Sequence, residues 1–179
     1  MSPTTVDPRK FPIGPLSLQD TYSSDELAHN IAILVEAPSQ YRQLVENRSA
    51  DELAKTYREG SWTVQQLIHH VADIHLLHYF RMKKALTEPD YDTPTLINMD
   101  GWAATPDATL APIEDSLQMF ETINLRYLFL IRSLDEAQLA KAYFHPVRKI
   151  RIDQAQAVAM SVWHVQHHLA HIKLALGLP

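Results

Sequence analysis

The sequence of 179 residues contains no cysteine, only four glycines and no long apolar run. The absence of cysteine excludes a disulfide scaffold, a cysteine-ligated zinc or iron–sulfur site and a cysteine nucleophile. No stretch approaches the roughly 20 apolar residues that a membrane span requires, and residues 1–19 contain no apolar run of signal-peptide length. We therefore expect a cytoplasmic protein that does not associate with membranes.

Positive charge is also sparse. The chain has 16 Lys and Arg residues against 21 Asp and Glu residues, which gives a formal net charge of −5. The cations form no cluster, so the phosphate neutralisation that drives nucleic-acid binding is not expected. Hydrophobic residues make up 46% of the chain, which is enough for a core without disulfides at this length. The sequence predicts a single domain over residues 1–179 with no nucleic-acid partner.

Long helices are predicted where glycine and proline are absent. The spacing of apolar residues predicts an all-α four-helix bundle, with helices over residues 24–47, 63–88, 112–134 and 153–177. Pro38 is expected to kink the first helix, and Gly177 to end the fourth. Either Ser61 or Thr63 can cap the second. Large side chains at helical spacing are expected in the core, namely Met82, Met119, Phe120, Tyr127 and Trp163.

The remaining segments connect these helices. Residues 1–20 hold four prolines and predict an extended N-terminal arm. Residues 89–111 are expected to form a long, ordered crossover between the second and third helices, because their large apolar side chains need burial. Residues 143–152 alternate around Pro146 and predict a small hairpin.

Histidine is concentrated in two places. Eight of the ten histidines lie within residues 69–78 and 164–171, windows that cover 18 of 179 positions. Such tracts are typical of metal binding. Helical spacing places His164 beside His168 and His167 beside His171, so either pair can reach one ion at about 2.0–2.1 Å. The first pair is favoured because small residues share its strip of the helix and leave room for an ion, namely Ala157, Ser161 and Ala175.

The second helix offers several further histidines. His75 and His78 lie at the centre of its apolar face and His70 lies at the edge, so periodicity alone does not select His70. His69 points to the opposite side and is expected to be solvated. Asp73, three residues after His70, is either a hydrogen-bond acceptor for a ligand histidine or an exposed acid.

Several strings of residues span nearly the whole chain and carry a family resemblance: FPIG (11–14), YREGSWTV (57–64), HHVADIH (69–75), DGW (100–102), FHP (144–146) and WHVQHHLAHI (163–172). They resemble the DinB superfamily of metal-binding four-helix bundles, and within it the YfiT-like group. In that family a histidine eight positions after the tryptophan that opens helix two joins an i, i+4 pair on helix four. The resemblance therefore implies that His70, His164 and His168 hold one divalent ion.

The resemblance implies a metal-dependent enzyme of one of two kinds. One is a hydrolase that uses metal-bound hydroxide. The other is a transferase that activates a low-molecular-weight thiol, such as bacillithiol, and adds it to an electrophilic small molecule. We favour the transferase, because no carboxylate beside the ligands offers a general base for hydrolysis. A metal-stabilised binding module without turnover is the third alternative.

Four further residues are candidates to line the pocket or to act in catalysis: Asp73, His75, Arg81 and His145. Arg81 can hold a substrate carboxylate by bidentate hydrogen bonds. His167 and His171 are expected to lie near the ion without ligating it. Histidine ligands suit several metals, of which we expect zinc or nickel. The resemblance also suggests a homodimer.

Overall fold

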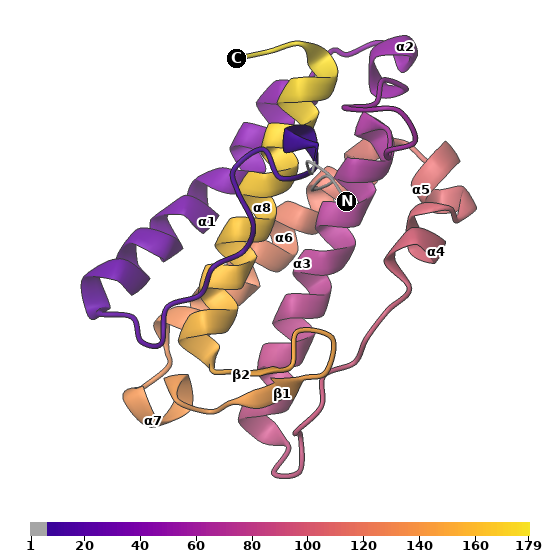
Figure 1. Ribbon diagram of the computed structural model, residues 1–179. Coiled ribbons are helices and arrows are strands. Elements are labelled where there is room, and N and C mark those ends of the chain that lie inside the picture. Colours follow the sequence, from indigo (N-terminus) through magenta and orange to yellow (C-terminus); the bar gives the residue numbers. More distant parts are fainter. Residues whose placement is uncertain (1–6) are drawn as a thin grey trace, which may run out of the picture.

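The computed structural model describes residues 7–179, so residues 1–6 of the predicted arm lie outside the described part. Four long helices form a bundle in which α3 packs on α6 and α8, and α1 packs on the same two helices (Figure 1). These helices are α1 (Ser24–Val45), α3 (Val64–Thr87), α6 (Ile113–Arg132) and α8 (Gln154–Leu176). The predicted all-α four-helix bundle is confirmed.

The long helices begin and end at residues suited to those positions. Ser23, Thr63 and Asp153 each accept a bond from the backbone N–H three residues on, in reciprocal capping boxes. Gly177 ends α8 with a φ of 69°, a left-handed conformation that costs glycine little. Helix α1 continues through Pro38.

Short elements connect the bundle. The crossover between α3 and α6 contains two helical turns that pack on α3, and the predicted hairpin pairs Tyr143 with Ile152 in antiparallel register. The short elements are η1 (Pro8–Lys10), α2 (Ala50–Leu53), α4 (Met99–Ala103), α5 (Pro106–Leu110), α7 (Glu136–Leu139), β1 (Tyr143–His145) and β2 (Ile150–Ile152).

The core lies between the four long helices. Its largest side chains are almost fully buried, and burial of a large apolar side chain contributes roughly 1.5–3 kcal/mol to the free energy of folding. These side chains include Leu34, Tyr41, Leu67, Met82, Phe120, Tyr127 and Ile131. Three of the predicted core residues, Met82, Phe120 and Tyr127, belong to this set. Within residues 7–179, no helix is long and apolar enough to cross a membrane.

The crossover covers a face of α3 that the sequence predicts to be exposed. His69 is only 6% exposed, and its Nδ1 lies 2.8 Å from the hydroxyl of Ser116 on α6. The prediction that His69 is solvated is therefore wrong. Helical periodicity separates the faces of one helix, but it does not show that α4 and α5 fold back over the more polar face.

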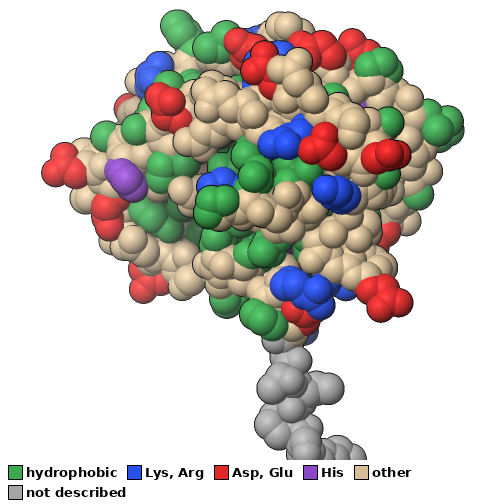
Figure 2. Space-filling model, turned by 90° about the horizontal axis from the view of Figure 1, so that it is seen from above, with side chains coloured by type: hydrophobic (Ala, Val, Ile, Leu, Met, Phe, Trp, Pro, Cys, Tyr) green, Lys and Arg blue, Asp and Glu red, His purple; other side chains and the backbone are tan. Residues whose placement is uncertain are grey.

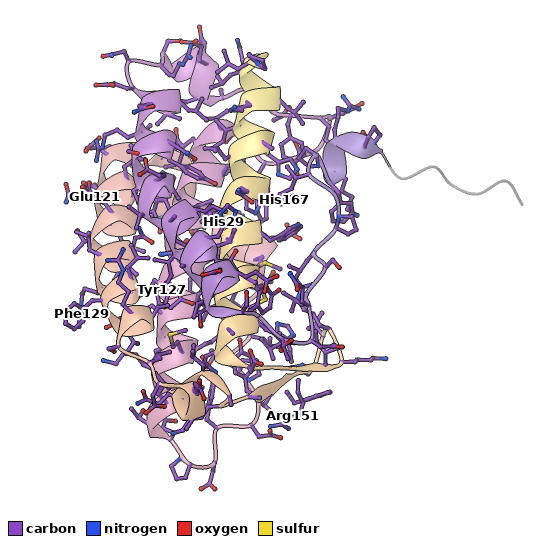
Figure 3. The ribbon with its side chains drawn as sticks, turned by 90° about the vertical axis from the view of Figure 1, so that its left-hand side faces the viewer. His29, Glu121, Tyr127, Phe129, Arg151 and His167 are labelled. Atoms are coloured by element: carbon purple, nitrogen blue, oxygen red, sulfur yellow. The ribbon has the colours of Figure 1, made fainter. Side chains whose placement is uncertain are left out.

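The N-terminal arm runs along the outside of α8 (Figures 1 and 3). Trp163 Nε1 on α8 donates to the Gly14 carbonyl at 3.1 Å, and Gln156 Nε2 donates to the Gln19 carbonyl at 2.9 Å. The arm is thus tied to the helix that carries four of the histidines.

Candidate metal centre

His70 on α3 faces His164 and His168 on α8 across the interior of the bundle. Nε2 of His70 lies 3.1 Å from Nε2 of His164, and one ring nitrogen from each of the three residues lies within 4.8 Å of the others. Two nitrogens bound tetrahedrally to one zinc ion are about 3.3 Å apart. The three histidines therefore form a cluster able to bind a metal ion.

Burial keeps these imidazoles neutral. It lowers the pKa of His70 to about 3 and holds the pKa values of His164 and His168 well below the usual histidine value. Little histidine surface is visible on the face of the molecule in Figure 2, although the chain has ten histidines. A neutral imidazole keeps the lone pair that ligation requires, so the cluster is in the ligating form at pH 7.

Trp62 covers one side of the cluster. Its ring centroid lies 4.5 Å from that of His70 and 6.3 Å from that of His168. Because Trp62 directly precedes the cap residue Thr63, the start of α3 fixes where this indole lies. Helical periodicity does not assign Trp62 to the site, and its position immediately before a capping box is the only local pattern that marks it.

A chain of polar atoms leads from His168 to the N-terminal arm. His168 Nδ1 lies 3.3 Å from His171 Nδ1, and His171 Nε2 lies 3.1 Å from the carbonyl oxygen of Arg9. A carbonyl only accepts, so His171 donates from Nε2 and accepts the Nδ1 proton of His168. This arrangement leaves the lone pair of His168 on Nε2, where a metal ligand needs it.

A second cluster shares one of these residues. Ring nitrogens of His167, His168 and His171 also lie within 4.8 Å of one another. Both nitrogens of His171 already have partners, whereas the buried Nδ1 of His167 has no hydrogen-bond partner in the described part of the chain. The ring of His167 stacks on Trp163 at 4.3 Å and lies on the side of α8 toward the arm (Figure 3).

A cavity of about 690 Å³ opens beside the histidine cluster. Its wall includes His164 and His78, whose ring centroids are 5.7 Å apart, so one end of the cavity reaches the cluster. Trp163, expected in the core, lies on this wall instead. Of the four candidate residues, Arg81 and His145 line the cavity; among the described lining residues there is no Asp or Glu.

His75 lies in the core and not at the cavity. It is 1% exposed, and its Nε2 lies 2.9 Å from Oδ1 of Asn124 on α6. Asn124 in turn donates to the Leu34 carbonyl at 2.8 Å. Burial lowers the pKa of His75 to about 4. These two buried hydrogen bonds join α3, α6 and α1.

Asp73 is half-buried on the side of α3 that the crossover covers. Burial, reinforced by the charge of Asp107 on α5, raises its pKa to about 6. Among the described hydrogen bonds none joins Asp73 to His70, so the acceptor role considered from the sequence finds no support in the geometry.

The sequence profile of the DinB superfamily matches residues 33–172. The chain belongs to the DinB superfamily. Its fold resembles the solved structure of YfiT from Bacillus subtilis with a TM-score of 0.90 at 30% identity, covering 97% of this chain and 100% of that one. YfiT is described there as a "probable metal-dependent hydrolase with an unusual four-helix bundle topology". The predicted resemblance is confirmed.

Curated relatives of this DinB chain have similar length. A "putative metal-dependent hydrolase" of Oceanobacillus iheyensis is 38% identical over 168 residues, which cover 94% of this chain and 95% of the relative. The relative of the same name from Bacillus subtilis, YfiT, is 34% identical over 164 residues, or 90% of each chain. These names support an enzyme that depends on a metal.

Proposed function

We propose that this DinB protein is a metal-dependent transferase that adds a low-molecular-weight thiol to an electrophilic small molecule. One observation carries the proposal: His70 and His168, which are buried, and His164, which is half-buried and lines the cavity, converge on one point, and no carboxylate occurs in the described cavity wall. Hydrolysis profits from a general base that removes a proton from water, whereas a thiol ionises more readily and attacks without one.

His70, His164 and His168 would hold one divalent ion, for which we propose zinc or nickel. Such an ion, ligated only by neutral groups, retains a charge of +2 and stabilises the deprotonated form of a thiol or of water. The histidines would supply the lone pairs that hold the ion, and Trp62 packs against the ring of His70. His171 orients His168 through the bond between their Nδ1 atoms.

Hydrolysis is the second candidate, because the relatives carry the name "putative metal-dependent hydrolase". A metal-stabilised binding module without turnover is the third. The three are distinguished by the product that a reactive electrophile gives with metal-loaded protein, in the presence and absence of a thiol.

The decisive experiment incubates the metal-loaded protein with a chromogenic aryl chloride and a panel of thiols, then analyses the products by mass. We expect a thioether, formed as the carbon–chlorine bond breaks and chloride and the thiol proton pass to solvent, only with metal and at pH values well below the free thiol pKa of about 8.5. An oxygen-bearing product formed equally well without thiol would establish the hydrolase instead. No metal-dependent product with any electrophile would favour the binding module.

The ligand assignment is tested by separate substitution of the histidines with alanine. Replacement of His70, His164 or His168 should abolish bound metal, measured by elemental analysis, with the bundle still folded by circular dichroism. Replacement of His167 should leave the metal bound. Equal losses at all positions would contradict the assignment.

The homodimer remains a prediction, as does the absence of a nucleic-acid partner. Sedimentation velocity measures the oligomeric state directly. Acidic and basic side chains are interspersed on the face shown in Figure 2, which is unlike the basic surface of a phosphate-backbone binder.

A further inference from the structure

Arg81 lies in the cavity wall as a buried cation. It is only 6% exposed, and its Nε and Nη2 both donate to the Thr95 carbonyl, at 3.1 and 2.5 Å. Among the described ion pairs none involves Arg81. A guanidinium stays charged at physiological pH, and a buried charge without a counter-ion is costly. The carbonyl satisfies two N–H groups but does not neutralise the charge.

A second cation lies at the same end of the cavity. Arg148, in the turn between β1 and β2, also lines the wall. Burial lowers the pKa of Arg81, and the positive charge of Arg148 acts in the same direction. His145, which also lines the wall, has a pKa lowered by burial and then by both arginines. Within the described residues, no carboxylate offsets these charges.

The rest of the cavity is mainly apolar. Leu18, Leu77, Ile97, Ile150 and Met160 are among its lining residues, and the cavity volume suits a small molecule. The opposite end is marked by the metal cluster. His78 lines the wall between the two ends: it precedes Arg81 by three positions on α3, about 4.5 Å of helix, and its ring centroid lies 5.7 Å from that of His164. An occupant of this space would meet a cationic end, an apolar middle and the histidine cluster.

We propose that the cavity binds a small organic acid with an apolar body, whose carboxylate pairs with Arg81 and whose other end lies against His164. The N–H groups of Arg81 that Thr95 does not use would donate to the carboxylate, and Arg148 would add attraction at the mouth of the cavity. The inference rests on the proposed function only for the role of this acid as a substrate. The anion site itself requires no metal.

The test measures binding of octanoate and of 1-octanol to chelator-treated full-length protein by calorimetry. The two probes share an alkyl chain and differ in charge. We expect octanoate to bind about 10- to 100-fold more tightly than octanol, as expected for hydrogen bonds to a charged group. Arg81→Gln should remove this preference and leave octanol binding unchanged. Arg126→Gln, at an exposed position on α6 outside the cavity lining, is the matched control and should retain it.

The outcomes separate this inference from the metal proposal. Equal affinity of the wild-type protein for the two probes, or equal behaviour of the Arg81 and Arg126 variants, would overturn the anion site. If Arg81→Gln does not fold, Arg148→Gln is the deciding variant, because the Arg148 side chain is exposed. Its substitution should weaken the binding of octanoate several-fold and leave the binding of octanol unchanged. Because every titration is done without metal, a failed metal site leaves the octanoate result unchanged.

Discussion

Protonation of His75 is expected to destabilise the folded protein strongly in mild acid. Burial lowers its pKa from 6.5 to about 4, so between these pH values the unfolded chain binds a proton that the folded chain does not. Stability therefore falls as the pH drops through this window. The whole pKa shift corresponds to about 3 kcal/mol in the free energy of unfolding, of which about 2 kcal/mol is lost by pH 5.

The perturbation that isolates this effect is His75→Gln. A glutamine amide can still donate to Oδ1 of Asn124 but does not ionise in this range. Urea unfolding of chelator-treated protein at pH 7 and pH 5 gives the free energy of unfolding at each pH. The decrease in the free energy of unfolding from pH 7 to pH 5 should be about 2 kcal/mol smaller in the variant than in the wild type.

His29→Gln provides the control, because His29 is an exposed histidine on α1 (Figure 3). Its substitution makes the same change of side chain at the surface without touching the core, so the variant should lose as much stability between pH 7 and pH 5 as the wild type. The reasoning would be refuted if His75→Gln lost as much stability between pH 7 and pH 5 as the wild type. In that case the charged imidazole would be accommodated in the fold despite its burial.

Four other substitutions test single residues of the site, the core and a helix end. Asp73→Asn should raise the free energy of unfolding by about 1 kcal/mol at pH 8 and leave it unchanged at pH 4. The pKa of the Asp73 carboxyl is raised to about 6, so this group destabilises the fold only when it is ionised. The expected gain is small because the side chain is partly exposed. Ser161→Ala removes the hydroxyl 3.0 Å from Nδ1 of His78 and should cost about 1–3 kcal/mol in urea unfolding. Gly177→Ala should lower the stability by about 1 kcal/mol, measured by thermal unfolding, because its φ is positive. His171→Ala should weaken metal binding about 10- to 100-fold in competition with a chromophoric chelator, and an unchanged affinity would rule out its role in orienting His168.

The helices and their ends were predictable because local interactions determine them. Thr63 caps α3 through a partner three residues away, and Gly177 ends α8 through its own backbone freedom. The hairpin followed in the same way from alternation around Pro146. Such features need no knowledge of the rest of the chain.

The surroundings of the site depend on segments distant in sequence, and the residue patterns did not predict them. His69 is buried because α4 and α5 fold over it, and His75 pairs with Asn124, a partner 49 positions away. Periodicity also left His70 undecided beside His75 and His78; only the family resemblance selected it. An apolar face can be assigned from sequence, but the neighbour that covers each position on it cannot.

The N-terminal arm meets the histidine helix mainly through its main chain. The carbonyls of Arg9, Gly14 and Gln19 accept the bonds from α8, and almost any residue type can supply a carbonyl. The backbone path of the arm must therefore be preserved rather than its side chains at these positions. Gly14 has a φ of 83°, a conformation that residues other than glycine rarely adopt, so replacement is most restricted there. Substitutions at arm positions that keep this course should leave the three bonds in place, whereas a deletion or insertion of one residue would shift the acceptors that follow it together.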